Sequence, residues 1–362
     1  MMKIAIICAT PYQTFNALNL IMNIFSDKNN KIDLYYRNFN KVSAGILENI
    51  KKENLVEHIY EYNIVEKRLN FIYLYNVLMQ VISTKKYLEL LLKNKESLKN
   101  KYDLITVTSG TEFEIAFTKF YAMASTIAYD DGLGSYVGDI IHHQNLNFFW
   151  RIIRNSQHIQ PICLYINNKE FCDSTISNSY IQFPRYPFKD KEKNKIIGNV
   201  FDYSNELKSN NRIIYLTQPL TEISRNIYDK NNEIEKIIFK NRRNITIRIH
   251  PRDKIKRTNQ NINISKANLW ELVCANEVNK NHILISYCST AQIIPKIMFN
   301  KEPYIIFLYK LIYKELSDKL KTKFNSIVDK VTDIYNEKNK VIIPKSQQEL
   351  IEIINKLESE NK

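Results

Sequence analysis

The sequence is poor in glycine and proline, with six and nine in 362 residues, which excludes collagen-like and long flexible segments. Its five cysteines are an odd number with no CxxC pair, so a disulfide framework or a zinc knuckle is not expected and a reducing cytoplasm fits. The longest uncharged stretch, residues 4–26, is too rich in polar residues for a membrane span.

Three motifs with well-defined chemistry are also missing. The chain has no GxGxxG, no Walker A sequence and no GxSxG elbow. These absences argue against a dinucleotide-binding Rossmann enzyme, a P-loop nucleotidase and a serine hydrolase.

The charge is strongly unbalanced, with 52 lysines and arginines against 38 acidic residues and a formal net charge of +14. Residues 185–257 alone hold 18 basic and nine acidic side chains. Such a surplus favours an anionic partner, namely a phosphorylated ligand, nucleic acid or an anionic membrane surface, and it is equally consistent with a solvated lysine-rich face. No RNP-like, helix-turn-helix or zinc signature accompanies it, so nucleic acid is not the expected partner.

Short apolar runs alternate with helical patterns along the whole chain, which predicts parallel sheets covered by helices. We therefore expect an α/β, GT-B-like fold with two Rossmann-type domains facing a central cleft, divided into residues 1–190, a linker at 191–210 and residues 211–362. Expected strands are 3–9, 31–37, 104–108, 126–129, 212–216, 245–249, 283–287 and 304–308, and expected helices include 11–25, 69–98, 112–124, 292–299 and 347–361.

The strand at 126–129 runs into Asp130-Asp131-Gly132-Leu133-Gly134-Ser135. Three of the six glycines lie between positions 132 and 138, which indicates a sharp turn or a close approach of a ligand to the backbone. Two adjacent carboxylates at a strand end repel each other, which favours a raised pKa and a role as a base. A simple Asp-Gly turn with capping carboxylates explains the same residues equally well.

Residues 245–249 place Arg248 and His250 on one face of a strand, at its carboxyl end. A guanidinium and a titratable imidazole at this position are suited to holding and protonating a phosphate. The alternative is a solvated strand end.

Two further strand ends carry small polar residues. Ser289 and Thr290 stand before an expected helix, where hydroxyls and backbone N–H groups bind anions or merely cap the helix. Thr10 and Gln13 follow the first strand, and Gln218 follows the first strand of the second half.

Taken together, Tyr129-Asp130-Asp131-Gly132, His250-Pro251 and Ser289-Thr290 resemble, in order and in strand-end placement, the motifs of the bacterial lipooligosaccharide sialyltransferases of glycosyltransferase family 52. The resemblance spans most of the chain, from the loop at Thr10 to the strand at 303–309. It implies inverting transfer of sialic acid from CMP-sialic acid to a galactoside of a surface glycan, either lipooligosaccharide or capsule.

In that family pattern Asp131 is the general base and His250 supports departure of CMP. Arg248, Ser289, Thr290 and Gln218 would contact the donor, and Glu271 would bind its ribose. Gly132, Gly134, Ser135, Thr10 and Gln13 would line the substrate loops. No cofactor is expected, and no metal, because the adjacent carboxylates do not form a DxD motif. A cytoplasmic protein is expected, with peripheral contact to the membrane and a homodimer both left open.

Two alternatives differ in partner. A GT-B glycosyltransferase that uses another nucleotide sugar shares every fold feature. A basic nucleic-acid-binding protein is the more distant alternative.

Overall fold

The structure is a computed structural model of the 362-residue chain. It describes residues 1–37, 41–63, 83–108, 111–132, 136, 161–172, 180–183, 190–207, 211–220, 227–240, 245–250, 252–253, 263–264 and 269–359. Gly134, Ser135 and Pro251 lie outside the described residues, as do residues 69–82 of the helix expected at 69–98. The rest of that expectation is wrong in part, because a helix at Thr84–Leu91 ends at the extended Leu92 and a separate 3-10 turn follows at Lys95–Lys99.

The chain folds into two compact units, Met1–Tyr203 and Ser204–Lys362. The first unit is built on a seven-stranded sheet of order β3-β2-β1-β4-β5-β6-β7, in which every pair is parallel. Its strands are β1 (Lys3–Cys8), β2 (Lys31–Arg37), β3 (His58–Tyr62), β4 (Leu104–Val107), β5 (Ser125–Tyr129), β6 (Leu164–Ile166) and β7 (Tyr180–Gln182). The central strands are buried on both faces, as their continuous apolar sequences require.

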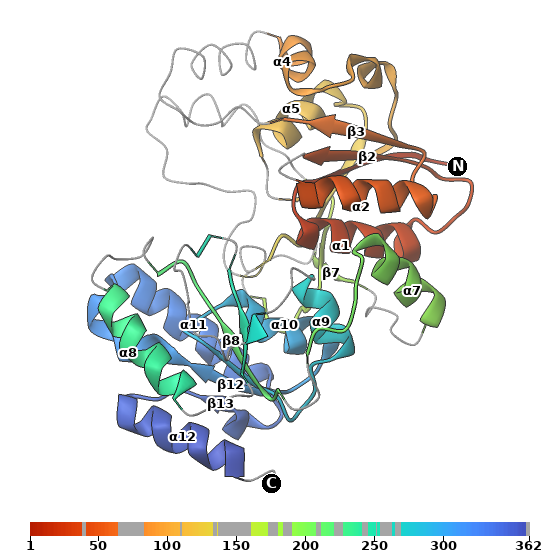
Figure 1. Cartoon of the computed structure of the whole chain (residues 1–362). Helices are drawn as coiled ribbons and strands as arrows, with labels where there is room; N and C mark the ends of the chain where they lie inside the picture. Colours follow the sequence, from red (N-terminus) through yellow and green to blue (C-terminus); the bar gives the residue numbers. More distant parts are fainter. Residues whose placement is uncertain are drawn as a thin grey trace. The chain divides into compact units, whose positions relative to one another are not determined.

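Helices cover this sheet, with α2 beside α7 and α4 beside α5 (Figure 1). Thr10 begins the first helix with a capping box completed by Gln13, and Pro11 occupies the first turn, where a missing N–H costs nothing. The helices are α1 (Pro11–Asn19), the π-helical η1 (Leu20–Ile24), α2 (Lys41–Lys52), α4 (Thr84–Leu91), the 3-10 turn η2 (Lys95–Lys99), α5 (Glu112–Phe120) and α7 (Lys191–Val200).

The second unit contains a six-stranded parallel sheet of order β10-β9-β8-β11-β12-β13. Its strands are β8 (Ile213–Leu216), β9 (Ile245–Arg248), β10 (Asn263–Ile264), β11 (Ile283–Ser286), β12 (Tyr304–Phe307) and β13 (Val341–Ile342). The order reverses direction at β8 and β11, and such a switch point is where ligands bind in open parallel sheets.

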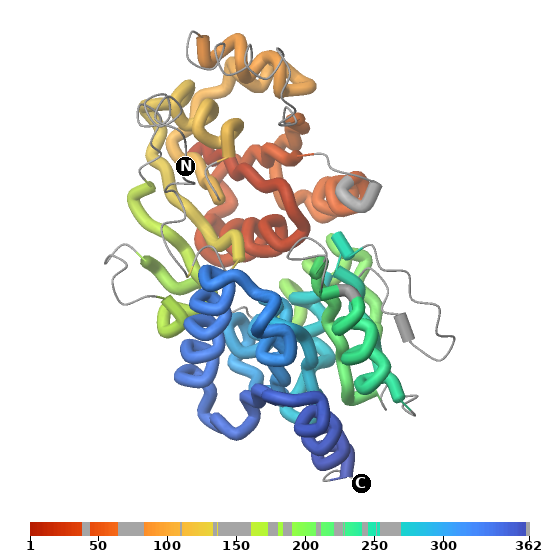
Figure 2. The backbone as a smooth tube through the Cα atoms, turned by 90° about the vertical axis from the view of Figure 1, so that its left-hand side faces the viewer, coloured from red at the N-terminus to blue at the C-terminus, as the bar shows by residue number. Residues whose placement is uncertain are grey.

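Helices α9 and α10 lie together on this unit, and α12 packs beside α8. Figure 2 follows the chain into its last helix, α12, drawn in dark blue. The helices are α8 (Ile227–Phe239), α9 (Trp270–Asn276), α10 (Thr290–Phe299), α11 (Asp318–Ile334) and α12 (Gln347–Ser359), with 3-10 segments η5 (Leu308–Glu315) and η6 (Lys338–Lys340).

The expected strands of both halves are present to within one or two residues, whereas the short strands β3, β6, β7, β10 and β13 were not predicted. The helix expected at 11–25 continues as α1 into the π-helical η1. The division between the units falls inside the segment 191–210, but Lys191–Val200 of that segment is a helix of the first unit rather than a linker. No helix in the described part of the chain is long and apolar enough to cross a membrane.

Candidate functional site

Asp130, directly after β5, is a fully buried carboxylate with a donor at each oxygen. The Gly132 N–H donates to Oδ1 at 2.7 Å. The Tyr136 hydroxyl and the Asn167 side-chain amide donate to Oδ2, the latter at 2.8 Å. Burial and the neighbouring Asp130 hold the pKa of Tyr136 well above its usual range, so its hydroxyl stays protonated and donates. Asp130 therefore fixes the path of the chain after β5.

Asp131 points elsewhere. It is partly exposed, and its Oδ1 accepts a hydrogen bond from the side-chain amide of Gln13. The two neighbouring carboxylates thus have separate partners, one structural and buried, the other next to solvent. The Asp-Gly turn is also present, because Gly132 has a φ of +108°, a conformation that favours glycine.

Gln13 joins three strand ends through one amide. Its Oε1 accepts the Ala9 N–H at 2.6 Å and the Thr10 N–H at 3.1 Å after β1. Its Nε2 donates to Thr108 Oγ1 after β4, at 3.1 Å, and to Asp131 after β5. Thr10, Gln13, Asp131 and Gly132, which the sequence placed on separate loops, are therefore brought together at the carboxyl edge of the first sheet.

In the second unit His250 lies two residues beyond β9 and is partly exposed. Its backbone N–H donates to Thr217 Oγ1 at 2.9 Å, which ties it to the end of β8. Its Nδ1 accepts the Arg252 N–H at 3.1 Å. In the neutral ring the proton is consequently on Nε2, because Nδ1 serves as an acceptor.

Gln218 links the same strand end to the next loop. Its Oε1 accepts the Cys288 N–H at 3.0 Å and the Ser286 hydroxyl at 3.3 Å, and its Nε2 donates to the Cys288 carbonyl at 3.1 Å. A chain of contacts therefore runs from His250 across the ends of β9, β8 and β11 to the start of α10.

Ser289 and Thr290 lie at that start of α10. Some of the hydroxyl and backbone N–H groups that were expected to bind a ligand cap the helix instead. The Ser289 hydroxyl accepts the Ala291 N–H at 3.3 Å, and the Ser289 N–H donates to the Gln292 side chain at 3.2 Å. The capping box occupies the Ser289 backbone N–H, so the capping alternative is present, and anion binding by the other donors of Ser289 and Thr290 stays a prediction. The two hydroxyls remain the candidates for a ligand.

Arg248 also differs from the expectation. Its guanidinium forms an ion pair with the buried Glu206 at 3.2 Å and lies over the Trp270 ring at 5.1 Å. Its charge is thus balanced inside the unit, which indicates that it holds β9 against α9. A contact with the donor stays a prediction for this residue.

Glu271 lies in the first turn of α9 and is 7% exposed. Burial raises the pKa of the adjacent Cys274 thiol, Glu271 adds to that shift and Arg248 opposes it. Glu271 therefore belongs to the Arg248 and Trp270 neighbourhood. Ribose binding by its buried carboxylate stays a prediction.

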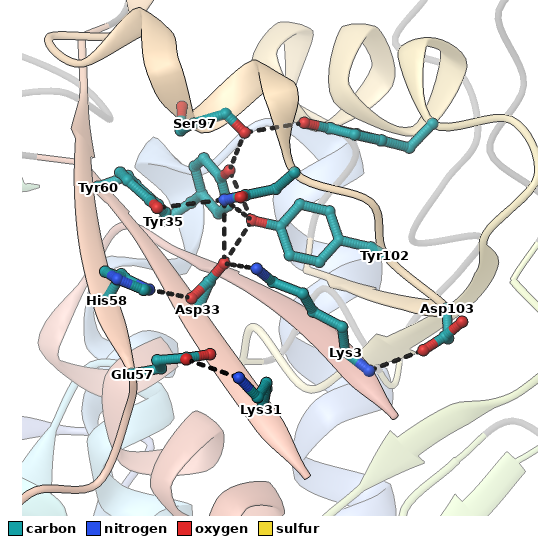
Figure 3. A network of polar contacts seen from close by, with 12 residues as sticks. Lys3, Lys31, Asp33, Tyr35, Glu57, His58, Tyr60, Ser97, Tyr102 and Asp103 are labelled. Atoms are coloured by element: carbon teal, nitrogen blue, oxygen red, sulfur yellow. Dashed lines mark hydrogen bonds and ion pairs between the residues drawn. The ribbon is translucent and has the colours of Figure 1, made fainter. Parts of the chain in front are cut away.

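One group of described side chains has metal-ligand spacing. Oxygens of Asp33 and Glu57 and a ring nitrogen of His58 lie within 4.8 Å of one another. Figure 3 shows that each carboxylate already has a lysine partner, Lys3 at 3.5 Å and Lys31 at 3.2 Å. The group also lies at the amino edge of the first sheet, away from Asp131.

Sequence reasoning missed several residues of these networks. Asn16 donates to the Asp130 carbonyl at 3.0 Å, and Asn167 and Thr108 hold the strand-end loops. Tyr136 and Thr217 belong to strand-end segments that the sequence singled out, but no role was assigned to them. Asn167 follows β6 directly, so the rule that polar residues after strands matter would have found it once that three-residue strand was recognised.

Several solved structures share this architecture at very low identity. The S. aureus protein MnaA, solved with UDP, is 11% identical, with 99% of this chain and 88% of that chain covered and a TM-score of 0.54. A UDP-N-acetylglucosamine 2-epimerase is 9% identical over 100% and 88%, with a TM-score of 0.53. The spinosyn rhamnosyltransferase SpnG is 10% identical over 99% and 100%, with a TM-score of 0.50.

No protein-family model matches the chain, and a search of curated proteins gives no match. The structural likeness establishes the fold. The chain has the GT-B fold, with two parallel-sheet α/β units, as the sequence predicted.

Proposed function

We propose that this protein is an inverting, metal-independent sialyltransferase that moves sialic acid from CMP-sialic acid to a galactoside hydroxyl of a bacterial surface glycan. The observation that carries the proposal is the hydrogen-bonded chain from His250 through Thr217 and Gln218 to the start of α10. It gathers an imidazole and two hydroxyl residues at a switch point of the sheet, where nucleotide ligands bind in this kind of fold.

Asp131 accepts the proton of the attacking hydroxyl. The acceptor oxygen forms a bond to the anomeric carbon as the bond from that carbon to the phosphate oxygen breaks, and CMP leaves with the electron pair. The hydrogen bond from Gln13 orients Asp131. This division of labour leaves Asp130 as a structural residue.

His250 stabilises the departing phosphate. Because its Nδ1 accepts the Arg252 N–H, Nε2 is the nitrogen that donates to a phosphate oxygen. The hydroxyls of Ser289 and Thr290 add two donors at the N-terminus of α10, whose dipole favours an anion. CMP is a good leaving group, so these donors suffice for its departure without a Lewis acid.

The acceptor is proposed to be galactose-terminated and attached to lipid, and the basic surplus would hold the enzyme at the cytoplasmic face of an anionic membrane.

A second candidate is an enzyme of the same fold acting on a UDP-sugar. The names of two structural neighbours favour it, since one was solved with UDP and another is a UDP-N-acetylglucosamine 2-epimerase.

Incubation with CMP-sialic acid and a panel of galactosides decides between the two, with CMP release and the product linkage as the measurements. Thermal shifts with CMP, UDP and GDP supply an independent measure of donor choice. Stabilisation by UDP alone, with no CMP release, contradicts sialyl transfer. The variant His250→Ala should weaken CMP stabilisation while leaving the melting temperature without ligand close to that of the parent.

A further inference from the structure

Asn167, the residue after β6, connects the buried Asp130 to α1. Its Nδ2 lies 2.8 Å from Asp130 Oδ2, 3.3 Å from Asn16 Oδ1 and 3.3 Å from the Tyr12 hydroxyl. Its backbone N–H donates to the Tyr136 hydroxyl at 3.2 Å. The side chain is 9% exposed, so its position is set by these contacts.

Chemistry determines which way this amide faces. An ionised carboxylate accepts hydrogen bonds only, so the Asn167 nitrogen must face Asp130. Asn16 is fixed in the same way, because its own Nδ2 donates to the Asp130 carbonyl and its Oδ1 is left to accept from Asn167. Turning the Asn167 amide over would set its oxygen against two acceptors.

The Asn167 Oδ1 is therefore the outward end of a fixed amide, and none of the residues that the structure describes donates to it. The residue keeps 9% of its surface exposed. A preoriented carbonyl that costs little to desolvate is suited to accept a hydrogen bond from a sugar hydroxyl.

The position supports this role. β6 neighbours β5 in the sheet, so the loops that carry Asn167 and Asp131 leave the same edge side by side. Tyr12, within 3.3 Å of Asn167, immediately precedes Gln13, which holds Asp131. A molecule whose hydroxyl is bonded to Asp131 therefore has its neighbouring groups near Asn167.

We infer that Asn167 recognises the acceptor: its Oδ1 accepts a hydrogen bond from a hydroxyl of the acceptor sugar other than the one that Asp131 deprotonates. This inference rests on the proposed function and assigns a specificity residue to the acceptor side of that site. An acceptor that bears this hydroxyl is favoured over its deoxy analogue. When the deoxy analogue binds, the Asn167 side-chain carbonyl loses its hydrogen bond to solvent and gains no other.

The test measures kcat/KM for galactosides that each lack one hydroxyl, with the wild type, Asn167→Ala and Asn167→Ser. In the wild type one deoxy analogue should lose about 3–10-fold, the effect of one neutral hydrogen bond. Asn167→Ala should lower kcat/KM for the parent galactoside to the value that the wild type has for this deoxy analogue. With the deoxy analogue itself, Asn167→Ala should show no further loss of kcat/KM. Asn167→Ser is a second truncation that keeps a polar side chain at this position, and it should show the same loss and the same lack of discrimination if Asn167→Ala fails to fold.

Tyr136→Phe is the control for a lost donor to Asp130, since it removes another donor to the same oxygen and, although it also removes the acceptor of the Asn167 backbone N–H, it keeps the Asn167 side-chain amide. It should retain the wild-type preference among deoxy analogues. Equal losses for every galactoside, or the same altered preference in Tyr136→Phe, overturn the inference and indicate a structural role.

Direct binding of the galactosides by saturation-transfer NMR separates this inference from the proposed function. Sialyl transfer without the expected coupling contradicts the acceptor role of Asn167 alone. Binding that shows the expected coupling, in a protein that does not use CMP-sialic acid, contradicts the proposed donor and leaves the assignment of Asn167 intact. Absence of galactoside binding in the wild type overturns the assignment.

Discussion

The first sheet has one fully buried aspartate near the amino ends of its strands, the amino edge, and another at their carboxyl ends, the carboxyl edge. The groups that surround these two aspartates differ in kind. Asp33, near the amino edge, has a tyrosine hydroxyl at 2.7 Å, the Asn100 amide at 3.2 Å and a lysine at 3.5 Å (Figure 3). Asp130, at the carboxyl edge, is held in the described part of the chain by neutral donors from its own loop and from Asn167.

The two edges differ in how their carboxylates are compensated. At the amino edge the charges of Asp33 and of Glu57 are matched by lysines, and His58 completes a closed network between β2 and β3. The buried Asp33 is thus paired with cations and neutral donors, whereas Glu57 and His58 lie at the surface, where an ion pair contributes little to stability. At the carboxyl edge neutral donors fix the buried carboxylate, and the next residue, Asp131, reaches solvent with the Gln13 amide beside it. Both buried aspartates are structural, but only Asp130 is followed by a second carboxylate that reaches solvent, the one proposed as the base.

The largest contrast is expected from Asp131→Asn. Loss of the base should lower kcat by about 10²–10⁴, with donor binding and the melting temperature retained, because the oxygen of the substituted amide can still accept from Gln13. Turnover with a saturating galactoside measures it, and Asp33→Asn is the control at the opposite edge. Near-normal turnover of Asp131→Asn would assign the base to another residue.

Asp130→Asn should mainly reduce stability. Its new amide would face either Gly132 or the pair Tyr136 and Asn167, so that donor meets donor, at a cost of about 1–3 kcal/mol in the free energy of unfolding. Urea denaturation gives this quantity. Turnover per folded molecule should fall less than in Asp131→Asn, and a larger fall would show that the assignment of the two carboxylates is reversed.

Asp33→Asn tests the closed network. We expect a smaller loss of about 1–2 kcal/mol in the free energy of unfolding, because Lys3 is partly exposed, His58 is exposed, and water can replace the lost partner. Activity per folded molecule should equal that of the wild type. A selective loss of turnover would show that the amino edge takes part in catalysis.

The smallest effect is expected from chelation. Turnover should be the same in EDTA as in its absence, since the carboxylates at the carboxyl edge are not arranged as a DxD pair. The comparison with added Mn²⁺, Mg²⁺ or Zn²⁺ also tests whether the Asp33, Glu57 and His58 group binds an ion. Activity that disappears on chelation and returns with Mn²⁺ or Mg²⁺ contradicts a metal-independent reaction.

Much of the fold was predictable because the central strands of both sheets are continuous apolar runs, such as residues 3–8 and 283–286. The edge strands were missed since they are short or partly exposed, as in His58–Tyr62 and Val341–Ile342. The polar residues after strands, Asp131, Gln13 and Gln218, do lie at loops that contact other strand ends, and the ligand roles assigned to them stay predictions.

What the sequence could not provide was the partner of each polar group. Arg248 is a charged residue at a strand end, as expected for a ligand contact. Only the fold reveals that it pairs with Glu206, 42 positions earlier. Ser289 similarly matches a ligand-binding pattern that a capping box matches equally well, and the position of Gln292 decides how its N–H is used. The convergence of Asp131 with His250, which belong to different units, stays a prediction.

Gln13 also limits which sequences this architecture tolerates. Its amide uses both an acceptor and a donor end, with two partners at each. Glutamate has the same shape and would keep the contacts of Oε1, but it would set a second negative charge directly against Asp131. Gln13→Glu, which is conservative at most surface positions, is thus disruptive here. Such a variant would need a compensating change at position 131 to restore the conformation of this loop.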